Sequence, residues 1–246
     1  MRTDLRQALD YTYQSARFRR PDWLRLYMST TADEAGAGKR SARNIANRPT
    51  LNLSARHVGR IIAAVDCSLS VGLKLNRFAT FHLEKAGVTD PVKAISRYLR
   101  QAATWVGYHG GTFAYVWVRE NGVGKGDHVH ILMHVEARLQ GRFRKLEREW
   151  KSRAGIVQRK GLRRVCRTRP VGRRLIDYLA LGPGSADYKA NLMAVRDYLL
   201  KGATQSVLDR FGIVRKSDGD CRVVGRRYGV SQSLTLGGAI SSTRRP

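Results

Sequence analysis

Cysteine is scarce in this chain, which has three in 246 residues. Cys67, Cys166 and Cys221 lie far apart, and none belongs to a Cys-x-x-Cys pair, so the usual spacing of a structural zinc site is missing. An odd number of cysteines without a recognisable signal peptide is typical of a reducing compartment. We therefore expect free thiols and a cytoplasmic protein.

Long apolar runs are absent and acidic residues are few. No apolar stretch approaches the roughly 20 residues of a transmembrane helix, so we expect no membrane partner. The chain has 19 acidic residues against 46 lysines and arginines, a formal net charge of +27. Such an excess repels itself unless a polyanion is near, which indicates a nucleic-acid partner whose binding weakens as salt rises. On charge alone, a non-catalytic nucleic-acid-binding protein is the favoured interpretation.

Local patterns divide the chain into three parts. Residues 1–75 are interpreted as a basic N-terminal extension, residues 76–202 as a regularly patterned domain, and residues 203–246 as a basic, partly disordered tail. Within the domain, β-branched and aromatic stretches predict strands over 78–83, 112–119, 127–135 and 161–169. Helical spacing predicts helices over 92–106, 139–153 and 191–201. This order predicts an α+β fold, an antiparallel sheet of about five strands flanked by helices, in a ferredoxin-like or RRM-like arrangement.

The most informative pattern is the hairpin expected over residues 112–135. Aromatic side chains alternate on its first strand and aliphatic side chains on its second: Phe113, Tyr115 and Trp117, then Val129, Ile131, Met133 and Val135. If these rows share one core, the same register places Glu120 beside His128 on the other, open face. A slip by one residue would break both matches. His130 shares that face because residues i and i+2 of a strand point the same way.

Glu120, His128 and His130 are therefore predicted to hold one metal ion. Two imidazoles and a carboxylate suit Mg²⁺, Mn²⁺ or Zn²⁺ and leave coordination positions for substrate oxygens. The identity of the third ligand stays open, because Glu120 could be a turn residue replaced by another side chain: His82, Glu84 or His134. Of these, His134 lies roughly 13 Å from His130 at about 3.3 Å per strand residue, which is too far to join the same ion.

The stretch from Glu120 to His134 resembles the His-hydrophobic-His motif of the HUH endonucleases. This superfamily includes rolling-circle replication initiators, plasmid relaxases and single-strand transposases. Initiators of this type commonly carry a metal carboxylate on the neighbouring strand, a position that Glu120 matches. Their nucleophilic tyrosine lies downstream, often as Tyr-x-x-Lys, which Tyr198 and Lys201 match. The resemblance covers roughly residues 76–202 and implies an HUH nuclease fold with one catalytic tyrosine, for which the competitors are Tyr178, Tyr188 and Tyr228.

The resemblance implies an enzyme that nicks and rejoins single-stranded DNA with Mg²⁺ or Mn²⁺, through a 5′-phosphotyrosine formed by Tyr198. Lys201 would steady the developing charge. Such an enzyme would start rolling-circle replication of a plasmid or phage at a stem-loop origin, with a host helicase supplying the unwinding. A transposase, a relaxase and a non-catalytic nucleic-acid-binding protein are the alternatives. Side chains expected to contact DNA, unless they form only a solvated basic face, are Lys125, Arg163, Arg164, Arg167 and Arg169.

Overall fold

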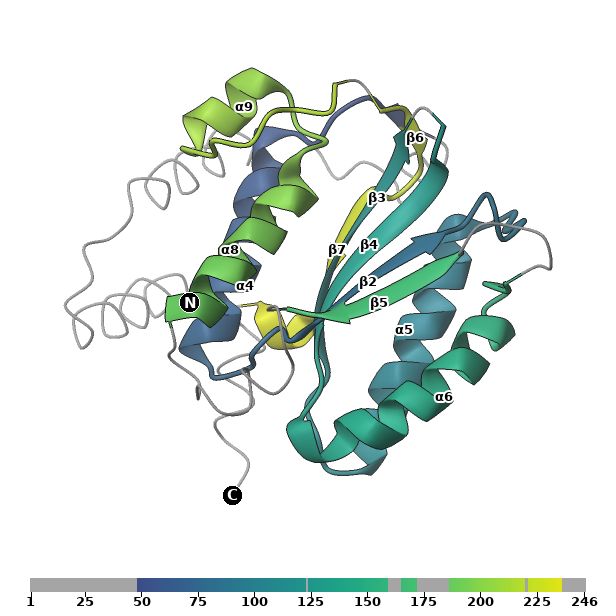
Figure 1. The fold of residues 1–246 in the computed structure, drawn as a ribbon. Coiled ribbons are helices and arrows are strands. Elements are labelled where there is room, and N and C mark those ends of the chain that lie inside the picture. Colours follow the sequence, from purple (N-terminus) through teal and green to yellow (C-terminus); the bar gives the residue numbers. More distant parts are fainter. Residues whose placement is uncertain (1–47, 123, 159–164, 172–185, 220, 236–246) are drawn as a thin grey trace, which may run out of the picture.

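A five-stranded antiparallel sheet forms the centre of the protein in a computed structural model, which describes residues 48–122, 124–158, 165–171, 186–219 and 221–235 (Figure 1). In the strand order β5-β2-β4-β3-β7, the bounds are Cys166–Pro170, Arg77–His82, Gly126–His134, Ala114–Gly122 and Tyr228–Val230. A separate two-stranded ribbon pairs β1 (Pro49–Thr50) with β6 (Val223–Val224). The predicted α+β fold class is confirmed.

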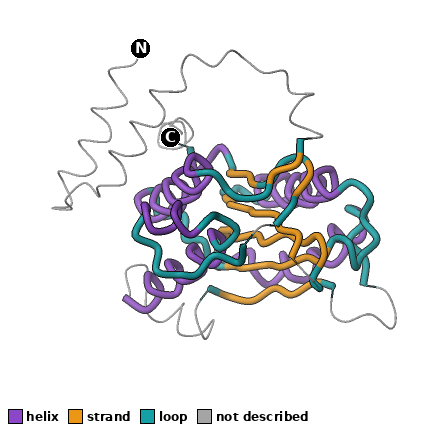
Figure 2. The backbone as a smooth tube through the Cα atoms, turned by 90° about the horizontal axis from the view of Figure 1, so that it is seen from above, coloured by secondary structure: helices purple, strands orange, loops and turns teal. Residues whose placement is uncertain are grey.

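Helices cover both faces of the sheet, so that the strands lie between two helical layers (Figures 1 and 2). On one face pack α5 (Pro91–Tyr108) and α6 (Gln140–Arg153), which follows the 3₁₀ turn η1 (Ala137–Leu139). On the other pack α4 (Ala55–Ser70) and α8 (Ala186–Leu200). The remaining described helical segments are α9 (Gln205–Arg210) and the 3₁₀ turn η2 (Gln232–Leu234).

The face under α5 and α6 holds the aromatic and aliphatic rows that the sequence predicted. Tyr115 pairs with Met133, and Trp117 pairs with Ile131. Met133, Trp117 and Ile131 are buried in one core. Because side chains alternate along a strand, this burial specifies the register of the whole hairpin. The opposite face of β3 and β4 is thereby determined as well.

That opposite face was expected to be open, and this expectation is wrong. Val116, Val118 and Leu132 are buried there in a second core with α4 and α8. Helix α4 begins at a capping box, in which Ser54 and His57 each accept the other's backbone N–H at 3.3 Å. Its apolar side then meets the sheet through Val58, Ile61, Ile62 and Val65. The apolar side chains on this face of β3 and β4 are removed from water only because helices cover them.

Segments outside residues 76–202 contribute to this packing. Helix α4, which the sequence placed in the extension, shares a core with β3 and β4. Strand β7, placed in the tail, pairs with β3 through Val116 and Val230. Residues 1–47 and 236–246 lie outside the described part of the chain. Within the described part, no helix is both long and apolar enough to cross a bilayer.

Candidate metal centre and nucleophile

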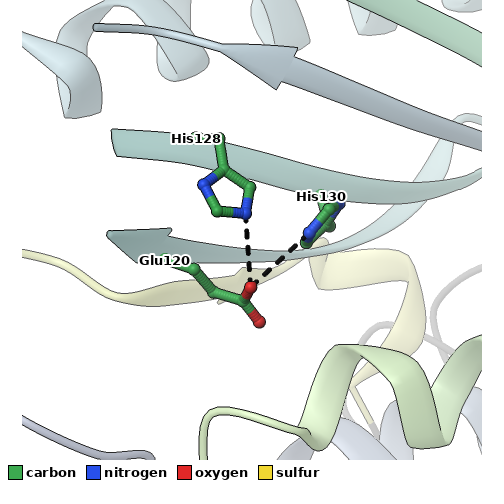
Figure 3. Close-up of side chains that lie close together, drawn as sticks. All are labelled: Glu120, His128 and His130. Carbon is green, nitrogen blue, oxygen red and sulfur yellow. Dashed lines mark ion pairs between the residues drawn. The ribbon is translucent and has the colours of Figure 1, made fainter. Parts of the chain in front are cut away.

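The β3–β4 hairpin brings three potential metal ligands together near its turn. Glu120 pairs with His128, and Val118 with His130, so the predicted register is correct. Glu120, His128 and His130 are each only 2% exposed. Figure 3 shows both imidazole rings turned toward the Glu120 carboxylate.

The distances between these side chains suit one ion. Glu120 Oε2 lies 3.3 Å from Nε2 of His128 and 3.6 Å from Nε2 of His130. Ligand atoms that each bind a metal at about 2.1 Å lie roughly 3 to 4 Å from one another. One ligand atom from each of the three residues lies within 4.8 Å of the other two. The cluster of Glu120, His128 and His130 can therefore hold a metal ion.

The hydrogen-bond contacts of the His128 and His130 rings on the side away from Glu120 also favour a metal ion. His128 Nδ1 lies 2.8 Å from the carbonyl oxygen of Gly126 and donates to it, which leaves Nε2, on the side of Glu120, as the ring nitrogen that can ligate a metal. His130 Nδ1 lies 2.9 Å from Thr80 Oγ1. His130 Nε2 and Glu120 Oε1 are buried without a hydrogen-bond partner among the described residues. Buried polar atoms normally have partners, and a cation held between these side chains would satisfy them.

The protonation states also suit metal binding. Burial lowers the pKa of His130 to about 4, although the nearby Glu120 opposes this shift. Burial by itself would raise the pKa of Glu120, but the contacts with His128 and His130 and the charge of Lys201 outweigh it and hold that pKa well below its usual range. At neutral pH the carboxylate is therefore ionised and the His130 imidazole is neutral, as metal ligation requires.

The other candidates for third ligand lie outside this cluster. His82 pairs with His128 across the strands, with ring centroids 5.5 Å apart. The carboxylate of Glu84 accepts the backbone N–H of Asp127 at 3.0 Å. The Nδ1 of His134 is 2.6 Å from the carbonyl oxygen of Lys74. Among the described residues, the compact group that can hold a metal consists of Glu120, His128 and His130.

Tyr198, near the end of α8, lies on the same side of the sheet as the cluster. Its ring centroid is 4.9 Å from that of His130, with the planes at 76°. Phe78 on β2 supports it edge-on at 5.8 Å, and the Arg215 guanidinium lies 4.8 Å from its ring. The half-buried ring of Tyr198 thus lies beside the cluster that can hold a metal ion.

Lys201, which was expected to steady the developing charge, is engaged with two carboxylates. Its ammonium is buried, forms an ion pair with Glu120, and lies 2.6 Å from the carboxylate of Asp218. Burial would lower the pKa of Lys201, but the two carboxylates outweigh it and raise that pKa. Lys201 Nζ still lies 5.0 Å from the centroid of the Tyr198 ring. Lys201 therefore lies between the Tyr198 ring and the Glu120 carboxylate, and its catalytic role stays a prediction.

The competing tyrosines are engaged elsewhere or lie outside the described residues. The Tyr188 hydroxyl is buried and donates to the carbonyl of Leu75 at 3.3 Å. The Tyr228 hydroxyl accepts from Arg60 at 3.2 Å. Tyr178 lies in a segment that the structure does not describe. Of the described candidates, Tyr198 has the ring contact with His130 of the candidate cluster.

The basic residues expected to contact DNA fall into three groups. Arg167 and Arg169 are exposed on β5, an edge strand, and pair with Thr80 and Phe78 of β2. They therefore share the sheet face of His130 and Tyr198, since cross-strand partners point the same way. Lys125 is exposed at the hairpin tip, where it lines a pocket of about 410 Å³. Two expected contacts lie outside the described residues: Arg163 and Arg164.

Three contacts around the site were missed by the sequence reasoning: Thr80, Asp218 and Arg227. Thr80 could have been found, because it precedes His82 by two residues on a predicted strand and so shares its face. Asp218 and Arg227 follow the recognised motif in a region assigned to the tail, and no local pattern relates them to Glu120.

No family model, curated protein or solved structure was found to match this chain.

Proposed function

We propose that this protein cuts and rejoins single-stranded DNA through a covalent tyrosine intermediate. The observation that supports this most is the 4.9 Å separation of the Tyr198 and His130 rings beside the buried Glu120 cluster. A phenol next to a metal-binding cluster, in a chain of net charge +27, suits chemistry on a phosphodiester. A divalent ion held by Glu120, His128 and His130, Mg²⁺ or Mn²⁺, would polarise the scissile phosphate.

In the proposed reaction, the Tyr198 phenol oxygen attacks the phosphorus and loses its proton to solvent. The bond from phosphorus to the 3′ oxygen breaks, and that oxygen leaves as a hydroxyl after taking up a proton. The 5′-phosphotyrosine conserves the energy of the phosphodiester, so a 3′ hydroxyl can attack it and restore the strand without ATP. Lys201 holds the Glu120 carboxylate in place and keeps a positive charge near the phenol.

The path of the DNA in this proposal follows the edge of the sheet. Arg167 and Arg169 project from β5 on the face of Tyr198, and the Arg169 guanidinium lies 5.3 Å from the Phe78 ring. Phe78 in turn contacts Tyr198. Two exposed guanidinium groups beside the nucleophile suit the backbone phosphates of a single strand.

We further propose that this activity starts rolling-circle replication of a plasmid or phage at a stem-loop origin, with a host helicase opening the duplex. The same chemistry would serve a transposase or relaxase. Sequencing the DNA attached to Tyr198 after purification separates these roles, because it identifies the element that carries the cleavage site.

A covalent-trapping experiment tests the chemistry. The protein is incubated with Mn²⁺ and a labelled pool of random single-stranded 40-mers, and adducts are counted on a denaturing gel. We expect adducts with wild type and with the control Tyr228→Phe, and none with Tyr198→Phe, whose DNA affinity should stay within about twofold. EDTA or the double variant His128→Ala, His130→Ala should also abolish them.

Two results would contradict the proposal. Adducts formed by Tyr198→Phe would show that another residue is the nucleophile. If wild type binds the pool tightly but forms no adduct with it or with stem-loop substrates, the protein is a non-catalytic nucleic-acid-binding protein.

A further inference from the structure

Arg227, which precedes β7, is a charged side chain buried next to the metal-binding carboxylate. It is 3% exposed. Its Nη1 donates to two backbone carbonyls, those of Thr50 at 2.9 Å and Cys221 at 2.8 Å. Its own carbonyl accepts the N–H of Arg119 at 2.8 Å. The guanidinium is therefore fixed in position by one of its three nitrogens and by the backbone.

The other two nitrogens of this guanidinium are unused. Nε and Nη2 of Arg227 are buried without a hydrogen-bond partner among the described residues, and so is Oε1 of Glu120. A guanidinium keeps its charge and its donors at any ordinary pH, so leaving two nitrogens unpartnered in the interior is costly. The two unpartnered donors of Arg227 require an acceptor from a ligand or a water molecule, whereas Glu120 Oε1 would be satisfied by the cation held in the cluster.

Gly202 lies close to both Arg227 and Glu120. A β-carbon on Gly202 would lie 3.3 Å from Arg227 Nη2 and 3.8 Å from Glu120 Oε1. The glycine has no positive φ that would require it for backbone reasons. It directly follows Lys201, and its missing side chain leaves a narrow gap beside Arg227 and the Glu120 carboxylate, into which an added methyl group fits only if the Arg227 guanidinium shifts.

The charges around the gap match an anion once a divalent ion is bound. Arg227 and Lys201 carry two positive charges, and Glu120 and Asp218 carry two negative ones, with Lys201 paired to both carboxylates. A divalent cation would leave this group with an excess of two positive charges. One phosphodiester charge, placed against the free edge of Arg227, would reduce that excess.

We propose that Arg227 binds a non-bridging oxygen of the DNA phosphate through its free Nη2 and Nε donors. This inference rests on the proposed function and adds a substrate-contacting residue to it. Arginine presents parallel N–H groups that match two phosphate oxygens, and a fixed donor aimed at developing charge favours the transition state over the bound substrate. Arg227 is then a catalytic residue that the Tyr-x-x-Lys and His-hydrophobic-His motifs do not contain.

The test compares Arg227→Gln with the neighbouring Arg226→Gln. Arg226 loses the same charge, but its guanidinium lies over the Trp117 ring, on the opposite face of β3. Two quantities are measured on the full chain: the Kd for labelled single-stranded DNA with Mn²⁺ by fluorescence anisotropy, in the Tyr198→Phe background so that no adduct forms, and the rate of adduct formation with Mn²⁺ at saturating DNA. For Arg227→Gln we expect DNA binding about tenfold weaker and adduct formation at least about 100-fold slower. For Arg226→Gln we expect both within about threefold of wild type.

The two measurements separate this inference from the proposed function. If wild type forms adducts and Arg227→Gln forms them at the same rate, the inference is overturned and the function stands. If wild type forms none, the function fails, and the binding measurement alone decides whether Arg227 contacts phosphate. Binding by Arg227→Gln as tight as by Arg226→Gln would then overturn the inference.

A second variant, Gly202→Ala, distinguishes a phosphate contact of Arg227 from a purely structural role. Gly202→Ala keeps both carbonyl contacts of Arg227 but fills the gap with a methyl group. We expect adduct formation at least tenfold slower, with an unchanged near-ultraviolet circular dichroism spectrum. A wild-type rate in Gly202→Ala would overturn the inference even if Arg227→Gln proved unable to fold.

Discussion

Replacing Thr80 by valine removes one contact to the metal-binding cluster while preserving the shape of the side chain. The Thr80 hydroxyl oxygen lies 2.9 Å from His130 Nδ1 and orients that ring. His130 is only 2% exposed, so water cannot readily replace the lost partner. The ring of Thr80→Val would therefore be less well oriented, with a buried nitrogen left unsatisfied.

The size of the effect follows from this burial. Losing the outer partner of a ligating histidine weakens metal binding about 10- to 100-fold. Because the ring is buried, we expect roughly 30-fold for Thr80→Val, which corresponds to about 2 kcal/mol. Isothermal titration of the purified protein with Mn²⁺ measures the change directly, without any need for a DNA substrate.

Thr168→Val on the neighbouring strand β5 is the matched control. The Thr168 hydroxyl donates to Glu147 at 3.2 Å, in the core on the opposite face of the sheet. The Mn²⁺ affinity of Thr168→Val should stay within about twofold of wild type. Wild-type affinity in Thr80→Val, or an equal loss in both variants, would refute the assigned contact.

Two further predictions concern stability. Burial raises the pKa of Asp66 from 3.8 to about 6, with Arg196 opposing the shift. Ionisation of Asp66 therefore lowers the free energy of unfolding. The loss is absent below about pH 4 and reaches at most about 3 kcal/mol above about pH 6. Asp66→Asn should raise the urea midpoint at pH 7 and not at pH 4, and equal midpoints at pH 7 would contradict this. Glu147 is buried and accepts from Arg77 at 2.9 Å and from Tyr98 at 3.1 Å, so Glu147→Gln should cost about 3 kcal/mol in urea unfolding. The exposed Glu149→Gln on the same helix should cost under about 0.5 kcal/mol, and equal losses would show that burial is not the cause.

The pairing of Glu120 with His128 could be predicted because it depends on local pattern alone. Aromatic and aliphatic residues alternate over 112–135, and burying both rows in one core is possible in only one register of the hairpin. The spacing of Tyr198 and Lys201 likewise placed both near the end of one helix. What the spacing could not reveal is that Lys201 would turn inward to Glu120 and Asp218.

The sequence by itself determined which side chains point to the same face of each strand, and hence that His128 and His130 share a face with Glu120 as one candidate third ligand. Only the tertiary structure decided what covers that face and what surrounds the cluster. The contacts of Thr80 with His130, of Lys201 with Asp218, and the gap at Gly202 between Arg227 and Glu120 join segments 17 to 107 residues apart. Such contacts depend on which strands pair within the sheet and on how α8 and the following chain pack against it, whereas the periodicity of one segment records only the direction of its own side chains.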